Sequence, residues 1–286
     1  MYLQNPHATD LSAQIEAWMA KQPEAEYCWL LDGSQLEAPD RRWLQRHATP
    51  WQSAFEGGPM AELADQGILL WSGNLPSQSW WPEWLALTSG RPQLSVIECR
   101  DGLPSSDFWH WLSQLGTEDG TSLVLRFADT HTLANALPLL NEEQQALVSS
   151  HIARWGWVGR DGNWEAYAFQ PAQPTATPWP PLLFNDEQYE QLMQRAHPDM
   201  LVPVLQHFEV ELPELSPAAL YQRLDGLSAA LREYGIEDTP SQALFTSIAF
   251  EQGDDFHEHP EWQTHWPQTR TGKPLTQILV EKNENL

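Results

Sequence analysis

Apolar and polar positions alternate with two different periods along this chain. Up to about residue 170, short apolar runs typical of strands lie between segments whose apolar residues recur at spacings of three and four, which is typical of helices. The expected strands fall at 27–31, 68–71, 94–99 and 123–127. Beyond residue 181 the period is helical throughout, over 186–196, 217–234 and 241–250. The pattern predicts an α/β N-terminal lobe, in which helices flank a mixed sheet, and a smaller all-helical C-terminal lobe.

Proline marks the boundary between these two lobes. Five prolines occur in the eleven residues from Pro171 to Pro181, with Gln, Thr and Ala among the residues between them. Because proline has a fixed φ and no backbone donor, this composition is typical of a stiff extended linker. We therefore expect an α/β domain over residues 1–170, a linker over 171–181, and a helical lobe with an acidic tail over 182–286.

The stretch from Leu123 to Trp164 joins several local signals in a short space. Residues 123–127 form an apolar run that predicts a buried strand closed by a turn. Asp129 is placed to cap the helix that follows, and Pro138 inside that helix predicts a kink or an early stop.

A second helix and a hairpin complete this stretch. Asn141 and Gln144 have the spacing of a capping box, which predicts where the second helix begins. The segments 154–158 and 164–169 flank an Asp161-Gly162 pair, and Asp-Gly favours a tight turn between antiparallel strands.

The charge of the chain bears on its partners and its location. Lys and Arg number 15 against 39 Asp and Glu, a net charge of 15 − 39 = −24, which repels nucleic acid backbones and anionic membranes. We find no apolar stretch near the roughly 18 residues of a membrane span and no signal peptide, so we expect a cytoplasmic protein. Cys28 and Cys99 lie in apolar surroundings far apart in sequence, which indicates buried thiols.

Candidate catalytic groups are few. The sequence has no phosphate-binding loop of the Gly-x-x-x-x-Gly-Lys type, no Gly-x-Ser-x-Gly and no His-Glu-x-x-His, so we expect neither a cofactor nor an enzyme. One alternative stays open, a hydrolase or metal-dependent enzyme using Asp32, Asp129 and His131, or the tail from His257 to His265. Caps and turns explain the two aspartates more simply, and a solvated tail explains the histidines.

Aromatic and basic clusters are the candidate binding residues. Among 16 tryptophans, Trp80, Trp81 and Trp84 gather on one expected helix, and neighbours such as Trp80 and Trp81 cannot both face one core. An exposed tryptophan is a typical interface anchor. A basic cluster is formed by Arg41, Arg42 and Arg46, which is either a solvated face paired with nearby acids or a contact for an acidic partner; further candidates in the helical part are Tyr189 and Tyr221.

The order of these pieces resembles a known family. Leu125 to Leu133 reads LRFADTHTL and precedes a helix, a capped second helix and a Trp-bearing hairpin, while Tyr27 to Gly33 reads as an apolar strand closed by Asp-Gly. This arrangement is similar to the effector adaptors, or chaperones, of type VI secretion, also described as domain of unknown function 4123. Where that family commonly has Asp-Pro-Arg, this chain has Asp129 followed by Thr and His. The residues that carry the resemblance are Asp32, Gly33, Arg126, Phe127, Asp129 and Trp155.

The resemblance implies a function in protein delivery. It implies a non-enzymatic cytoplasmic adaptor that binds a toxic effector and helps to load it onto the VgrG spike, without nucleic acid or membrane partners. The helical lobe follows the part that resembles the shared domain, so we expect it to hold the effector.

Overall fold

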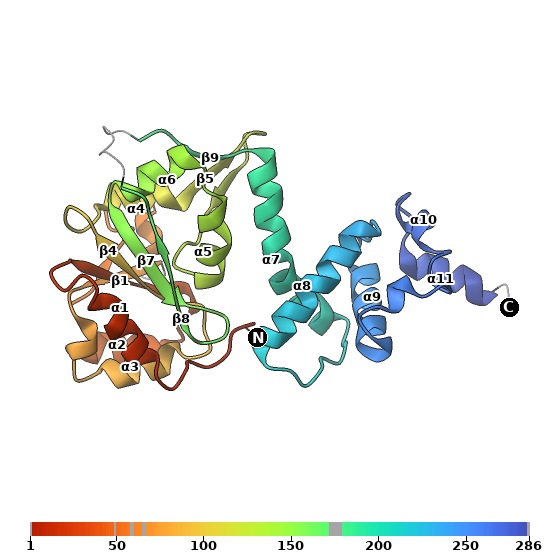
Figure 1. Ribbon diagram of the computed structural model, residues 1–286, viewed down its shortest axis with the longest axis horizontal. Coiled ribbons are helices and arrows are strands. Elements are labelled where there is room, and N and C mark those ends of the chain that lie inside the picture. Colours follow the sequence, from red (N-terminus) through yellow and green to blue (C-terminus); the bar gives the residue numbers. More distant parts are fainter. Residues whose placement is uncertain (1, 49, 58–59, 65–66, 172–178, 285–286) are drawn as a thin grey trace. The chain divides into compact units, whose positions relative to one another are not determined.

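The computed structural model describes residues 2–48, 50–57, 60–64, 67–171 and 179–284 (Figure 1). Contacts within the chain divide it into two compact units, one from Tyr2 to Leu192 and one from Met193 onward. The first unit is α/β and the second is helical, so the predicted fold class is confirmed.

The main sheet of the first unit has six strands in the order β2-β3-β1-β4-β7-β8, and every neighbouring pair is antiparallel. Its strands are β1 (Tyr27–Asp32), β2 (Gln52–Ser53), β3 (Ile68–Ser72), β4 (Leu94–Cys99), β7 (Ile152–Val158) and β8 (Trp164–Ala168). In the centre, Trp29 of β1 lies opposite Trp71 of β3 and Val96 of β4. β7 and β8 are the predicted hairpin.

Helices cover both faces of this sheet (Figure 1). Cys28 and Leu30 point to the face covered by α4 (Ser106–Ser113) and α5 (Thr130–Ala136). Tyr27, Trp29 and Leu31 point to the other face, which is covered by α1 (Leu11–Met19), α2 (Ala38–His47) and α3 (Trp81–Thr88). All six residues of β1 are buried for this reason, which explains why its sequence is continuously apolar.

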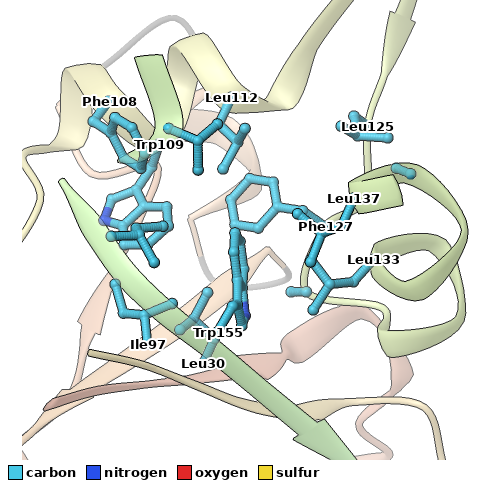
Figure 2. Close-up of a cluster of buried hydrophobic side chains, with 14 of the residues drawn as sticks. Leu30, Ile97, Phe108, Trp109, Leu112, Leu125, Phe127, Leu133, Leu137 and Trp155 are labelled. Atoms are coloured by element: carbon cyan, nitrogen blue, oxygen red, sulfur yellow. The ribbon is translucent and has the colours of Figure 1, made fainter. Parts of the chain in front are cut away.

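Aromatic rings fill the layer between the sheet and α5 (Figure 2). Trp155 of β7 and Phe127 meet edge to face with ring centroids 5.8 Å apart, and Trp109 of α4 stacks on Phe127 at 5.5 Å. The loop before α5 therefore contributes its phenylalanine to the centre of the core.

A second, three-stranded sheet contains β5 (Gln114–Thr117), β6 (Ser122–Val124) and β9 (Leu182–Phe184). β5 pairs antiparallel with β6 and parallel with β9, so the mixed arrangement occurs here and not in the main sheet. The prediction of a buried strand at 123–127 is correct only for a strand at its start, and its burial and its end are wrong. β6 ends at Val124, which is 58% exposed, and the buried Leu125 and Phe127 lie in the loop that follows.

The helices after this loop begin and end as the sequence predicts. Asp129 caps α5, which stops at Ala136 and gives way to a short 3-10 helix, η4 (Leu137–Leu139), that contains Pro138. Asn141 and Gln144 form the capping box of α6 (Glu142–Ser149). The remaining 3-10 helices of this unit are η1 (Gly33–Gln35), η2 (Ala61–Leu63) and η3 (Leu75–Ser77).

The division between the units falls inside α7 (Asp186–His207), between Leu192 and Met193. The predicted linker lies mostly outside the described residues, because 172–178 are not among them, and its position stays a prediction. Residues 182–192 lie in the α/β unit, where β9 pairs with β5.

The helical unit continues from α7 through α8 (Pro217–Glu233), α9 (Thr239–Gln252), η5 (Phe256–Glu258), α10 (Trp266–Thr269) and α11 (Leu275–Glu284). The solvated tail expected around His257 to His265 is correct only in part, because most of its side chains are exposed but the stretch is anchored to the helical unit. Phe256, His265 and Trp266 are buried, and the Phe256 and Trp266 rings pack against Phe245 of α9. These aromatic contacts anchor the stretch to the unit, while its acidic residues stay exposed.

Candidate functional site

Residues far apart in sequence meet where β1 ends and α5 begins. Asp32 is the last residue of β1, Asp129 is the N-cap of α5, and Arg126 lies between β6 and that cap. We call the group of Asp32, Ser34, Gln35, Arg126 and Asp129 the Asp32 cluster. It unites three of the residues that carry the family resemblance with two polar residues from the turn after β1.

Arg126 joins the two carboxylates of the Asp32 cluster. One of its terminal nitrogens lies 2.6 Å from Asp32 Oδ2, 2.8 Å from Ser34 Oγ and 3.8 Å from Asp129 Oδ2. Gln35 Nε2 donates to Asp129 Oδ2 at 3.2 Å and lies 3.4 Å from Asp32 Oδ2. The cluster therefore ties the end of β1 to the start of α5.

Backbone N–H groups also donate hydrogen bonds to the two carboxylates of the cluster. Asp32 accepts from the backbone N–H of Ser34, and Asp129 accepts from the N–H groups of His131 and Thr132. Burial raises the pKa of Asp129 above its usual 3.8, against the opposing effects of His131, the Thr132 amide and Arg126. Burial disfavours the charge on Arg126, but Asp32 and Asp129 outweigh it and raise the pKa of Arg126.

An apolar pocket of about 180 Å³ lies beside the Asp32 cluster. Asp32, Ser34 and Arg126 form its polar side, and the rest of its lining includes Phe55, Met60, Leu63, Ile68, Val124 and Leu125. The Asp32 side chain is only 6% exposed, whereas the Arg126 side chain is 51% exposed. The pocket therefore offers an apolar surface with one accessible cation at its edge.

Replacing Asp129 with alanine is expected to lower the free energy of unfolding by about 0.5–2 kcal/mol. The cost arises because the start of α5 loses its cap. It is partly offset because a charged carboxylate is no longer buried. Chemical denaturation measures the change. Asp10→Ala is the matched control, because Asp10 precedes α1 without making a side-chain cap. An Asp129→Ala variant that melts like the parent but no longer binds a partner would contradict this structural role.

The three candidate tryptophans do not share one environment. Trp81 is 3% exposed and Trp84 is 0% exposed, so both belong to the core and neither is a surface anchor. Burial follows from their position on the inner face of α3, where Trp84 packs against Trp71 at 4.3 Å. Trp80 is half-buried and stacks on Trp84 at 5.2 Å, which leaves it as the one partly accessible member of the three.

The arginine cluster lies on α2 as predicted. Arg41 donates to the carbonyl of Gly33 and lines a pocket of about 270 Å³ with Leu44 and Trp51. Arg42 and Arg46 are exposed. Arg41 therefore supports the turn after β1, while the other two face solvent.

The two candidate tyrosines belong to different units. Tyr189 packs against the core of the α/β unit. Tyr221 of α8 donates its hydroxyl to the carbonyl of Arg195 at 3.3 Å within the helical unit. Both side chains are half-buried.

The histidines proposed for catalysis lie in separate surroundings. His131 Nδ1 is 3.0 Å from Arg160, on the hairpin side of α5. His257 lies 3.3 Å from the Tyr234 hydroxyl in the helical unit. Within the part of the chain that the structure describes, no group of three or more His, Cys, Asp or Glu is placed to hold a metal ion, and no helix is long and apolar enough to cross a membrane.

Comparison with known proteins gives one match. Residues 13–147 match the family described as Domain of unknown function (DUF4123). This range runs from α1 to α6 and contains the whole Asp32 cluster, whereas Trp155 lies beyond it. No curated protein and no solved structure matches the chain.

Sequence reasoning found the ends of this cluster but not their pairing. Asp32 and Asp129 were separate signals of a turn and a cap, Arg126 was noted only for the family resemblance, and 94 residues separate Asp32 from Arg126. The one available signal for the additional members was the polar Ser34-Gln35 pair directly after the Asp-Gly turn.

Proposed function

We propose that this chain is a non-enzymatic adaptor that binds a type VI secretion effector in the cytoplasm and helps to load it onto the VgrG spike. The match of residues 13–147 to the family described as Domain of unknown function (DUF4123) carries the proposal, because most of the residues that resemble type VI effector adaptors lie in this range. The Asp32 cluster is consistent with a non-enzymatic role. Its carboxylates accept hydrogen bonds from backbone N–H groups and form an ion pair, as structural carboxylates do.

The surface of the α/β unit supports a binding function. Trp80 is partly accessible, Arg42 and Arg46 are exposed on α2, and the apolar pocket ends at the half-exposed Arg126. A few aromatic or basic anchors around a pocket suit a partner that must be held firmly and later released.

The experiment reconstitutes loading with the full chain. Effector and VgrG proteins encoded in the same genome are purified, and their association is measured with and without the chain. We expect the effector to reach VgrG only when the chain is present. Effector–VgrG association that is equally strong without the chain would contradict the proposal.

Surface variants then locate the contact. Trp80→Ala and a double Arg42→Glu, Arg46→Glu variant change the proposed surface, and Lys21→Glu is a control charge reversal at another exposed position. Metal analysis and a hydrolase screen on the same protein test the enzymatic alternative. Turnover that disappears with Asp32→Asn in a folded chain would favour that alternative.

A further inference from the structure

α7 carries two apolar faces within the helical unit. Leu201, Val202 and Leu205 are buried on one face. On the same part of the helix, His197 Nδ1 lies 2.9 Å from Ser228 Oγ of α8, and Tyr221 of α8 donates to the Arg195 carbonyl. This face therefore holds α7 to the rest of the unit.

A second face of α7, next to the packed one, is apolar and accessible. Met193, Ala196, Met200, Val204 and Phe208 follow one another at spacings of three and four residues, so they form a single stripe. Met193 is 37% exposed, Met200 48% and Phe208 40%, and the other two are half-buried. At about 1.5 Å per residue the stripe is about 22 Å long, enough to contact four turns of another helix. We call these five residues the α7 stripe.

The surroundings of the α7 stripe are acidic. No Lys or Arg occurs from residue 196 to residue 222, a range that contains Asp199, Glu209, Glu211 and Glu214. The three glutamates are exposed in the loop between α7 and α8. Over residues 193–286 the sequence has 6 basic and 15 acidic residues, a net charge of 6 − 15 = −9.

Among these acids, Glu209 has an unusual backbone conformation. It directly follows Phe208 and has φ 54°, the only positive φ of a non-glycine residue in the described ranges. Glycine is usual at this position after a helix, and a negative charge there opposes the helix dipole. The glutamate is therefore unfavourable for the local fold, although it adds charge at the end of the stripe.

We infer that the α7 stripe is the docking surface for a basic amphipathic helix of the effector. Its apolar side chains would cover the partner's apolar stripe, and the adjacent glutamates would pair with Lys or Arg flanking that stripe. Methionines suit this task because their flexible side chains adapt to different sequences. The choice of the effector as the source of the helix rests on the proposed function.

Charge decides between this occupant and a second copy of the chain. Two copies would bring together surfaces that each belong to a unit of net charge −9, and their glutamates would repel one another. A basic helix meets the same surface with opposite charge.

The first test uses the full chain and defined peptides. The probe is a fluorescein-labelled 18-residue peptide of Leu and Lys with helical amphipathic spacing, and its scrambled version has the same composition. We expect the amphipathic peptide to bind at least about tenfold more tightly, and the double variant Met200→Gln, Phe208→Gln to remove this difference. Val280→Gln is the control, because Val280 is 56% exposed on α11 of the same unit.

Charge is tested separately. A triple variant, Glu209→Gln, Glu211→Gln and Glu214→Gln, should weaken peptide binding and flatten its dependence on salt. Circular dichroism melts verify folding, and Met200→Gln and Phe208→Gln are also made singly. Unchanged peptide affinity in the double variant, or an equal loss in Val280→Gln, would overturn the inference. Self-association that the double variant abolishes, without peptide binding, would overturn it in favour of a second copy.

The effector then separates this inference from the proposed function. Full retention of the effector by the folded double variant would overturn the α7 stripe as the effector contact while leaving the adaptor function intact. Failure of the parent chain to bind the effector at all would instead refute the adaptor function. Loss of effector binding in the double variant, with retention in Val280→Gln, supports both.

Discussion

Replacement of Trp155 with alanine is expected to lower the free energy of unfolding of the α/β unit by about 3–5 kcal/mol. The side chain is 0% exposed, its ring meets Phe127 at 5.8 Å, and its Nε1–H donates to Ser95 Oγ at 3.2 Å. Alanine would leave a cavity between the main sheet and α5 (Figure 2) and remove the partner of a buried hydroxyl.

Urea denaturation measures this loss. Far-UV circular dichroism reports the whole chain, so tryptophan fluorescence is preferable, because 14 of the 16 tryptophans lie in the α/β unit. Trp155→Phe keeps most of the ring volume and should cost clearly less, and Val124→Ala is the matched control because Val124 is 58% exposed. If Trp155→Ala cost no more than Val124→Ala, Trp155 would not support the fold as the packing indicates.

The cavity left by Trp155→Ala would also affect the Asp32 cluster. Phe127 lies next to Arg126 in the chain, so a cavity at Trp155 removes packing from the loop that positions the arginine. We therefore expect any partner contact made by Arg126 to weaken in Trp155→Ala for a structural reason. Arg126→Gln, which leaves Phe127 in place, separates the two effects.

Local signals in the sequence predicted most element boundaries. The cap at Asp129, the stop at Pro138 and the Asn141–Gln144 capping box each depend on residues a few positions apart, and the structure confirms them. The Asp161-Gly162 turn belongs to the same class, with φ 86° at the glycine. Short-range hydrogen bonds and φ preferences determine such features, so a single sequence contains them.

Features that depend on tertiary contacts were predicted less well. The run 123–127 is apolar because Leu125 and Phe127 enter the core from a loop, and periodicity does not separate a buried loop from a buried strand. The stretch around His257 reads as polar and is mostly exposed, but Phe256 and Trp266 anchor it through contacts with Phe245.

The candidate binding residues also show the difference between features set by local sequence and features set by tertiary contacts. The helix spacing indicated correctly that Trp80 and Trp81 face different ways, but only the packing of α3 on the sheet shows that Trp80 is the accessible one. The pairing of Asp32 with Arg126 joins residues 94 positions apart, and no local pattern encodes it. The α7 stripe was missed because the expected helix covered only residues 186–196, whereas α7 continues to His207 and has apolar residues on two faces.

Replacement of Arg154 with methionine is expected to lower the free energy of unfolding by about 3–5 kcal/mol. Arg154 of β7 lies opposite Glu98 of β4 and forms an ion pair with it, and these side chains are 17% and 11% exposed. The guanidinium also lies 4.5 Å from the centre of the Trp18 ring and donates to the Trp18 carbonyl at 3.3 Å. Methionine would keep much of the packing but leave the Glu98 carboxylate buried without its cation.

A double-mutant cycle isolates this effect. Glu98→Gln combined with Arg154→Met should recover part of the loss, because the neutral amide no longer leaves an unpaired buried charge. Glu233→Gln is the control in an exposed pair, since Arg270 and Glu233 are 51% and 64% exposed and 3.7 Å apart, and it should change stability by less than about 1 kcal/mol. If Arg154→Met behaved like Glu233→Gln, solvent would have to reach Glu98 in the folded state, and α1 would not seal this face of the sheet as its contact through Trp18 indicates.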